Sequence, residues 1–330
     1  MKHLERALEG KNGIGRYILM SVIVLLLAQL AAFPLFLVLL PTFLSNGGNI
    51  GDFLDAVILN PYDYGISYNL YLLVMLGTFA FMYLLFALLI KPFHGRTVRE
   101  TINGRKKIRW DRIWMGIMVW GIFILVDTAI SVLTASPSEY EFRFNPGAFF
   151  TLILILLIVM PFQTSIEEIM FRGYLTQGVA RWTRSRWWAL LIPSLLFALM
   201  HVANPEVKEY GFWLSMPQYL IMGLMLGMVS ILDDGIELAL GVHFVNNALG
   251  SLLVTHHASV LQTDALFLFH DIDPAASLIS ISVSSVLLVF VLQRIYKWDW
   301  KILNKKVMPT LPPAPPVVET DYTADSTMEN

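Results

Sequence analysis

The chain has 330 residues, of which 56% are hydrophobic and only 15% are charged, and its mean hydropathy is +0.62. About a quarter of the residues of a soluble domain are charged, so this composition favours a protein that lies in a lipid bilayer. The formal net charge of -2 points to no class of partner, and the chain has no cysteine. Disulfides, thiolate metal sites and a catalytic cysteine are therefore excluded.

Eight stretches are apolar and long enough to cross a membrane, which takes about 20 residues per helix. In chain order, we expect spans at 17–44, 66–91, 111–134, 147–175, 187–203, 212–232, 235–254 and 276–295. The first stretch is too long for the apolar core of a signal peptide and has no clear cleavage site, so we expect it to be a retained helix. The sequence thus predicts an all-α, multi-pass bundle of about eight transmembrane helices in the cell membrane.

Basic residues gather on one side of the predicted bundle, the side that holds both chain ends. Of the 23 lysines and arginines, only Arg143 and Lys208 fall on the opposite side, and Arg172 lies within a span. Cytoplasmic loops are enriched in lysine and arginine. We therefore expect both termini to be cytoplasmic, and an even number of spans agrees with this because it places both ends on one side.

Nine polar side chains lie inside the predicted spans, where ionisable groups are costly and mark functional sites by default. They are Asp127, Glu167, Glu168, Arg172, His201, Glu237, His243, Asn246 and Asn247. A packing role suits the isolated Asp127, and Glu237 is close enough to the cytoplasmic start of its span to be interfacial. The other seven fall into three short motifs.

The first motif lies in the segment SIEEIMFRGYL, residues 165–175. Glu168 and Arg172 are four residues apart, the favourable order and spacing for an ion pair on a helix. Glu167 points about 100° away around the same helix, so one arginine cannot neutralise both acids. An unpaired carboxylate in an apolar setting is a stronger base than one in water, which suits a general base.

The other two motifs place a histidine on each of two further spans. Phe197 and His201 are four residues apart, as are His243 and Asn247, so the members of each pair share a helix face. A single histidine in a membrane helix more often bonds a neighbouring helix than performs catalysis. Together, three helices supply Glu, His, His and Asn that can converge on one water. Counted from the cytoplasmic ends of the spans at ~1.5 Å per residue, His201 lies about 5–10 Å deeper than Glu167 and His243. We therefore expect its helix to start earlier than predicted or to bend near Pro193.

The order EExxxR, FxxxH and HxxxN, each on a separate span, resembles the CPBP family of intramembrane proteases. That family includes the type II CAAX prenyl endopeptidases and the Abi proteins linked to bacteriocin processing and self-immunity. The motifs are Glu167 to Arg172, Phe197 to His201 and His243 to Asn247, and the resemblance covers about 145–255. It implies hydrolysis of a peptide bond within or beside the membrane.

The resemblance also implies a role for each motif residue. Glu167 is expected to act as the general base that activates water, with help from His201. His243 and Asn247 are expected to stabilise the tetrahedral oxyanion, because donors placed where charge develops contribute strongly to catalysis. The remaining two motif residues, Glu168 and Arg172, are expected to support Glu167.

A metal-dependent mechanism stays open beside this one. Glu167, His201 and His243 make a plausible zinc ligand set, and zinc would activate a bound water. The HExxH pattern is absent from the sequence. We prefer the metal-free mechanism and keep zinc as the alternative cofactor.

Two other classes of function compete with the protease interpretation. One is a non-enzymatic bacteriocin self-immunity protein, and the other is a transporter, which predicts repeated halves that the sequence does not show. As partners we expect a lipid bilayer and a membrane-associated peptide or protein substrate, prenylated or bacteriocin-like, and no nucleic acid. The chain then divides into N-terminal helices (1–134), a protease-like catalytic core (145–255), a last helix (276–295) and a proline-rich, disordered cytoplasmic tail (307–330).

Overall fold

The computed structural model describes residues 3–55 and 61–309 and is 75% helical. This confirms the predicted class, an all-α polytopic membrane bundle. Its longer helices are α1 (Ile14–Phe36), α4 (Tyr68–His94), α6 (Trp110–Thr134), α7 (Pro146–Ile158), α10 (Arg186–Leu199), α12 (Phe212–Leu232), α13 (Glu237–Leu253) and α14 (Pro274–Tyr296). Shorter helical pieces are η1 (Glu5–Leu8), η2 (Leu37–Leu39), α2 (Leu40–Ser45), η3 (Ile50–Asp52), η4 (Pro61–Tyr64), α5 (Val98–Ile102), α8 (Met160–Glu168), η5 (Ile169–Leu175), α9 (Thr176–Thr183), α11 (Pro205–Tyr210) and η6 (Trp300–Asn304).

Six helical segments of the described chain are long and apolar enough to cross a membrane. They are Ile14–Ser45, Tyr68–His94, Trp110–Thr134, Pro146–Thr183, Phe212–Leu232 and Pro274–Tyr296. The two remaining predicted spans, 187–203 and 235–254, correspond to α10 and α13, which have only 14 and 17 residues. The multi-pass character of the protein is therefore established, while the total of eight spans and the cytoplasmic position of the termini stay predictions.

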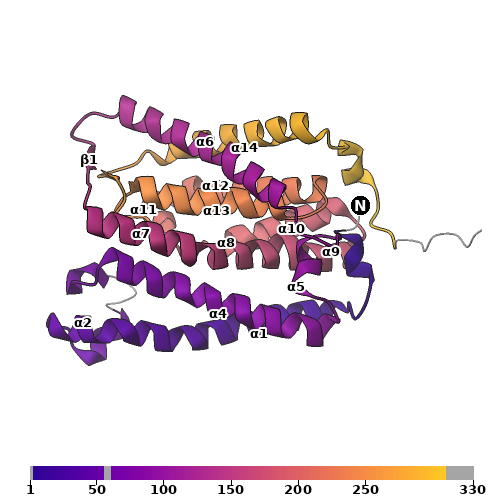
Figure 1. Ribbon diagram of the computed structural model, residues 1–330, viewed down its shortest axis with the longest axis horizontal. Coiled ribbons are helices and arrows are strands. Elements are labelled where there is room, and N and C mark those ends of the chain that lie inside the picture. The colour runs from indigo at the N-terminus through magenta and orange to yellow at the C-terminus, as the bar shows by residue number, and fades with distance from the viewer. Residues whose placement is uncertain (1–2, 56–60, 310–330) are drawn as a thin grey trace, which may run out of the picture.

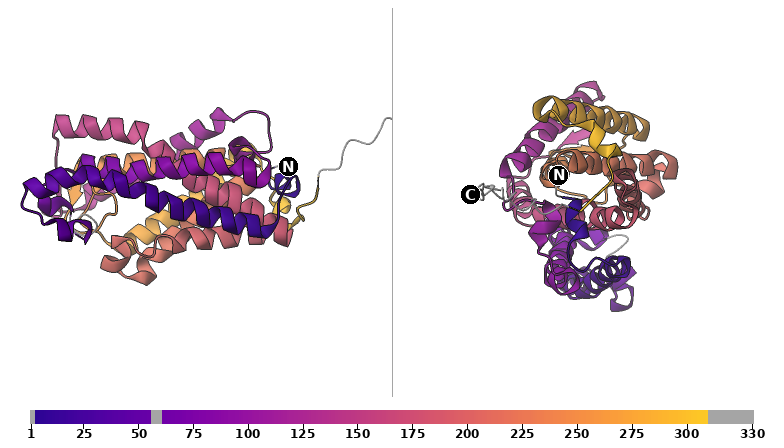
Figure 2. Two further views of the ribbon diagram at one scale, coloured as in Figure 1. Left: turned by 90° about the horizontal axis from the view of Figure 1, so that it is seen from below. Right: turned by 90° about the vertical axis from the view of Figure 1, so that its right-hand side faces the viewer.

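The helices run roughly along one axis. In Figure 1, α1 and α4 form a pair along one edge, α6 and α14 lie along the opposite edge, and α7, α8, α12 and α13 lie between them. Seen along the axis, the pair of α1 and α4 stands beside the rest of the bundle (Figure 2, right). The described chain begins and ends at the same end of the bundle (Figure 1), as an even number of crossings requires.

A small sheet, which the hydropathy pattern did not predict, lies at the other end of the bundle (Figure 1). Strand β3 (Phe267–Phe269) pairs antiparallel with β1 (Tyr140–Phe142) and parallel with β2 (Val254–Thr255). Tyr140 stands opposite Phe269 in the register, and their rings are 5.5 Å apart. The sheet joins the loop after α6 to the loop between α13 and α14.

The fourth predicted span is longer than expected. The prediction ended it at 175, but the chain stays helical through α8, η5 and α9 as far as Thr183. Gln177, in the added part of the segment, is fully buried and accepts a 2.7 Å hydrogen bond from Arg96. Segment η5 is a π-helix, a local widening of the helix that is frequent at functional sites.

The structure describes only the first three residues of the predicted tail, 307–309. Val307 is fully buried, and its N–H donates a 2.9 Å hydrogen bond to the carbonyl oxygen of Arg184. This residue is therefore packed against the bundle. Residues 310–330, the rest of the predicted tail, lie outside the described residues.

Helices α6 and α13 approach each other closely because glycines face each other across their crossing. A Cβ atom on Gly116 would lie 2.5 Å from the carbonyl oxygen of Leu238, and one on Gly241 would overlap the carbonyl oxygen of Ile113. Small residues let membrane helices pack backbone to backbone. The crossing brings α6 within side-chain reach of the polar residues on α13.

Candidate active site

The ion pair predicted within the first motif is present and buried. Glu168, at the end of α8, is fully buried, and Arg172 is only 1% exposed. The guanidinium NH1 of Arg172 donates a 2.8 Å hydrogen bond to Oε1 of Glu168. The Phe197 ring on α10 lies 4.0 Å from the guanidinium carbon, so the cation is covered by an aromatic face.

Glu167 lies next to this pair, and its two carboxylate oxygens have different surroundings. Oε1 accepts a 2.7 Å hydrogen bond from Nε2 of Gln163, one helical turn earlier on α8. Oε2 is buried, has no hydrogen-bond partner in the described chain and lies 3.6 Å from Nε2 of His243. One oxygen is thus held in place, while the other is available to a reacting proton.

His243, on α13, lies between the two carboxylates. Its Nδ1 is 2.7 Å from Oε1 of Glu168, and because a carboxylate can only accept, Nδ1 carries the proton of this bond. Its Nε2 is 3.3 Å from the side-chain nitrogen of Asn247. The third motif therefore contacts both members of the acidic pair.

Asn247 completes a group of side chains in direct contact. Its Nδ2 donates a 3.0 Å hydrogen bond to Oε1 of Gln163, and its Oδ1 accepts a 3.0 Å hydrogen bond from Nδ2 of Asn246. Gln163, 7% exposed, thus bridges Asn247 and Glu167. Gln163 belongs to none of the three predicted motifs, although its position four residues before Glu167 places both on one helix face.

His201 lies close to this group and packs against Phe197. It follows the end of α10, where its Nδ1 is 2.7 Å from the carbonyl oxygen of Phe197, and it stacks on Tyr219 with 4.4 Å between the ring centres. The Phe197 ring is 4.7 Å from that of His201 and 6.1 Å from that of His243. His201 interacts electrostatically with Glu167 and His243, but within the described chain it forms a hydrogen bond with neither.

The arrangement does not present a ready metal site. Across residues 3–55 and 61–309, no group of three or more His, Cys, Asp or Glu side chains is placed to hold a metal ion. Of the three zinc-ligand candidates, Glu167 and His243 are 3.6 Å apart, and the Nδ1 atom of His201 is taken up by the carbonyl oxygen of Phe197. Within the described residues, the three side chains are therefore not grouped as a three-ligand zinc site.

Two further polar residues from the spans lie away from this group. Glu237 is fully buried, and its Oε2 accepts a 2.6 Å hydrogen bond from Arg109, the residue before α6. Asp127 is exposed on α6 and accepts a hydrogen bond from Ser280 of α14. Both make contacts between helices, and neither touches Glu167 or the histidines in the described structure.

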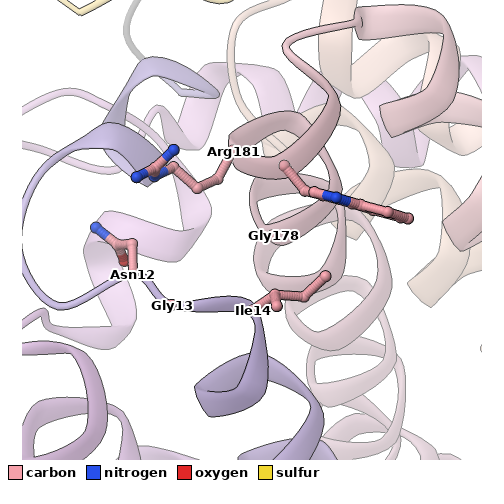
Figure 3. Close-up of a pocket in the computed structure, with 6 residues that line it drawn as sticks. Asn12, Gly13, Ile14, Gly178 and Arg181 are labelled. Carbon is pink, nitrogen blue, oxygen red and sulfur yellow. The ribbon is translucent and has the colours of Figure 1, made fainter.

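A separate cavity of about 200 Å³ lies between the start of α1 and helix α9 (Figure 3). Its lining residues are Asn12, Gly13, Ile14, Gly178, Arg181 and Trp182. None of the predicted site residues is among them. The cavity is therefore distinct from the group around Glu167.

Comparison with known proteins points to one family. Residues 147–249 match the family model described as type II CAAX prenyl endopeptidase Rce1-like. The matched residues include all six predicted site residues, from Glu167 to Asn247.

One curated relative extends the similarity over most of the chain. It is an uncharacterised protein of Bacillus subtilis (strain 168), YyaK, which is 29% identical over 261 residues, or 79% of this chain and 84% of the relative. No solved structure matches the chain. The match of residues 147–249 to the Rce1-like family model confirms the resemblance carried by the three motifs.

Proposed function

We propose that this protein is an intramembrane endopeptidase that hydrolyses a peptide bond of a membrane-associated substrate by means of water activated by Glu167. The Rce1-like family implies a protease that acts in a lipid bilayer. The observation that carries the specific proposal is the asymmetry of Glu167, whose Oε1 is fixed by Gln163 while Oε2 is buried and unpaired beside His243. A fixed carboxylate with one free oxygen is suited to take a proton from water.

The first step is attack on the scissile carbonyl. A water beside Oε2 of Glu167 gives its proton to the carboxylate as its oxygen bonds to the carbonyl carbon. His201 can orient this water, because a ring whose Nδ1–H donates to the Phe197 carbonyl has its lone pair on Nε2. The carbonyl π electrons move onto the oxygen and produce an oxyanion.

The second step is stabilisation and collapse of the tetrahedral intermediate. Asn247 gives one N–H to Gln163 and has a second N–H, which lies toward His243 Nε2 and can donate to the oxyanion. His243 Nε2 can donate to the same oxygen when the ring carries both protons. The C–N bond then breaks, and protonated Glu167 returns its proton to the leaving amine.

Glu168 and Arg172 support this chemistry without taking part in proton transfer. The Glu168 carboxylate binds the Arg172 guanidinium and His243 Nδ1 through the same oxygen, Oε1. Holding His243 by Nδ1 directs its Nε2 toward Glu167 and Asn247. A carboxylate that orients a histidine in this way is a common supporting element of catalytic sites.

The substrate class follows from the location of the site. Its residues lie on helices of a membrane bundle, so the scissile bond must be presented from the membrane or its surface. A lipid-anchored or prenylated peptide and a bacteriocin-type leader both meet this requirement. We therefore propose a membrane-tethered peptide or protein as the substrate.

The test is cleavage of membrane-tethered peptides by the purified full-length protein, with and without a chelator. Glu167→Gln keeps the size of the side chain and removes the base, so we expect cleavage to stop. Glu141→Gln, the same change at an exposed strand residue, should cleave like the wild type.

Each other outcome has a defined meaning. Wild-type cleavage by Glu167→Gln would remove the proposed base, and loss of wild-type activity with chelator would favour the zinc mechanism. An inactive wild type that still protects cells from a bacteriocin would replace the protease proposal with the self-immunity alternative.

A further inference from the structure

A line of hydrogen bonds connects helix α6 with the carboxylate of Glu167. Trp120 Nε1 donates to Oδ1 of Asn246 over 2.9 Å, and Asn246 Nδ2 donates to Oδ1 of Asn247 over 3.0 Å. Asn247 Nδ2 donates to Oε1 of Gln163 over 3.0 Å, and Gln163 Nε2 donates to Oε1 of Glu167 over 2.7 Å. Every member donates to the next, from the indole to the carboxylate.

The chemistry of the two ends sets the direction of the whole line. The indole nitrogen of Trp120 can only donate, and an ionised carboxylate can only accept. The three amides between them can each be turned in two ways, but only one combination gives every bond a donor and an acceptor. In that combination Asn247 turns its oxygen toward Asn246 and its nitrogen toward the active site.

The packing of α6 keeps the indole in place. Trp120 is 2% exposed, and it lies one turn beyond Gly116, where α6 and α13 cross at close distance. The next residue, Gly121, faces the side chain of Val245 on α13. A tryptophan held in this way has little freedom to lose its bond to Asn246.

We propose that Trp120 is a positioning residue for the oxyanion donor: through Asn246 it fixes the orientation of the Asn247 amide so that N–H groups, and not the carbonyl oxygen, face the substrate. This inference rests on the proposed endopeptidase function. Trp120 lies outside the matched residues 147–249. The N-terminal helices thereby contribute to the same site as the Rce1-like segment.

The first experiment compares two tryptophan variants in the cleavage assay. Trp120→Phe keeps an aromatic ring and removes the indole N–H. Trp298→Phe is the matched control, since Trp298 is also buried and its Nε1 donates a 3.1 Å hydrogen bond to Oδ1 of Asp233, away from the active site. One hydrogen bond is worth about a factor of 10 in rate, so we expect kcat of Trp120→Phe to fall about 10-fold with KM unchanged, and kcat of the control to stay at the wild-type value.

A double-mutant cycle separates positioning from a general loss of packing. In an Asn247→Ala background, the residue through which Trp120 acts is gone. Trp120→Phe should therefore cause no further fall in kcat in that background. An equal 10-fold fall in both backgrounds would overturn the proposal, as would an unchanged kcat in the single variant.

A second measurement tests the hydrogen-bond line without a cleavage assay. In protein with ¹⁵N-labelled indoles, the signal missing from Trp120→Phe identifies Trp120 among the nine tryptophans. That signal should shift in Asn247→Ala, because Asn246 loses its acceptor and turns, while the Trp298 signal stays. An unmoved Trp120 signal would refute the hydrogen-bond line even if the protein proved not to be a protease. Absence of cleavage with a shifted signal would refute the proposed function, and with it the oxyanion role, but not the hydrogen-bond line.

Discussion

Gln163 and Glu167 form a 2.7 Å hydrogen bond between Nε2 and Oε1 that leaves the second oxygen of Glu167 unpaired. The bond differentiates two otherwise equivalent carboxylate oxygens, because only one of them can then meet a substrate water. Gln163 also accepts a hydrogen bond from Asn247, so it links the proposed base to the proposed oxyanion donor.

Replacing Gln163 should therefore affect catalysis more than stability. Gln163→Met keeps the length of the side chain but removes both hydrogen bonds, each worth about 1 kcal/mol. We expect kcat to fall about 10- to 100-fold in the peptide cleavage assay. Gln218→Met is the matched control, because among the described residues Gln218 bonds only main-chain oxygens, on α12 and at the start of α14. Equal activity of both variants would contradict the role given to Gln163.

Asn247→Ala should reduce cleavage without abolishing it. The substitution removes one oxyanion donor, which costs roughly 10²–10³ in rate, while Glu167 keeps its bond to Gln163. The measurement is kcat against that of Glu167→Gln, whose activity should be lost altogether. If Asn247→Ala cleaves as fast as the wild type, the oxyanion must be bound elsewhere.

Arg172→Ala should lose stability as well as activity. The change leaves Glu168 fully buried without its cation, and removal of one partner of a buried pair costs about 3–5 kcal/mol. Melting temperature and cleavage should be measured together, with Arg181→Ala, an exposed arginine on α9, as the control. Adding Glu168→Gln to Arg172→Ala should restore part of the stability but not the activity, since His243 then loses its carboxylate.

The crossing of α6 and α13 can be tested with two glycines of one helix. Gly241→Ala would overlap the carbonyl oxygen of Ile113, so the helices must separate, at a cost of about 1–3 kcal/mol. Gly250→Ala, on the same helix, has no atom within 4 Å of the added methyl group and should be neutral or stabilising. Thermal unfolding in detergent measures both, and similar melting temperatures for the two variants would contradict the close crossing.

Acidification should weaken the attachment of the N-terminal segment. His3 is buried, and burial lowers its pKa below 6.5. The hydrogen bond with the Arg172 carbonyl and the nearby acids Asp234 and Glu237 raise the pKa by less than burial lowers it. Arg109 lowers the pKa further. A histidine with a lowered pKa stays neutral when folded and takes up a proton when unfolded. Its contribution to stability is therefore complete above about pH 6.5 and is lost as the pH falls toward the lower folded pKa.

His3→Gln provides the comparison for this prediction. Glutamine can keep a hydrogen bond to the Arg172 carbonyl but does not titrate. The melting temperature of the wild type should fall more between pH 7.5 and pH 5.5 than that of the variant. Parallel curves for the two proteins would exclude His3 as the source of the acid sensitivity.

Helical spacing predicted much of the site because side chains four residues apart must share a face. The pairs Glu168 with Arg172 and His243 with Asn247 are in contact as the spacing requires. What spacing cannot supply is the order of helices around the axis. Trp120 and Asn246 are in contact because glycines let α6 approach α13 closely, and no local sequence pattern predicts that contact.

The predicted difference in depth between His201 and Glu167 is absent, because the fourth helical segment is longer than hydropathy predicted. The fifth helix begins at Arg186, close to the predicted start, and Pro193 lies within it. It is the fourth helical segment that is longer, since it continues to Thr183. Glu167 and His201 are then about equally far, some 22–24 Å at ~1.5 Å per residue, from the turn that joins their helices.

The π-helix at Ile169–Leu175 makes the width of one helical turn, and not only the identity of its residues, a determinant of this protein. Thr176 Oγ1 donates to the carbonyl of Phe171, five residues back. If the same residues wound as an ordinary α-helix, everything beyond them would rotate by about 100°, because a π turn holds about one residue more than an α turn. Gln177 would then leave Arg96 and the main-chain oxygen of His3. Deletion of one residue from this turn should therefore give an ordinary α turn and keep the contacts of Gln177, whereas a deletion in the α-helical part of the segment should break them.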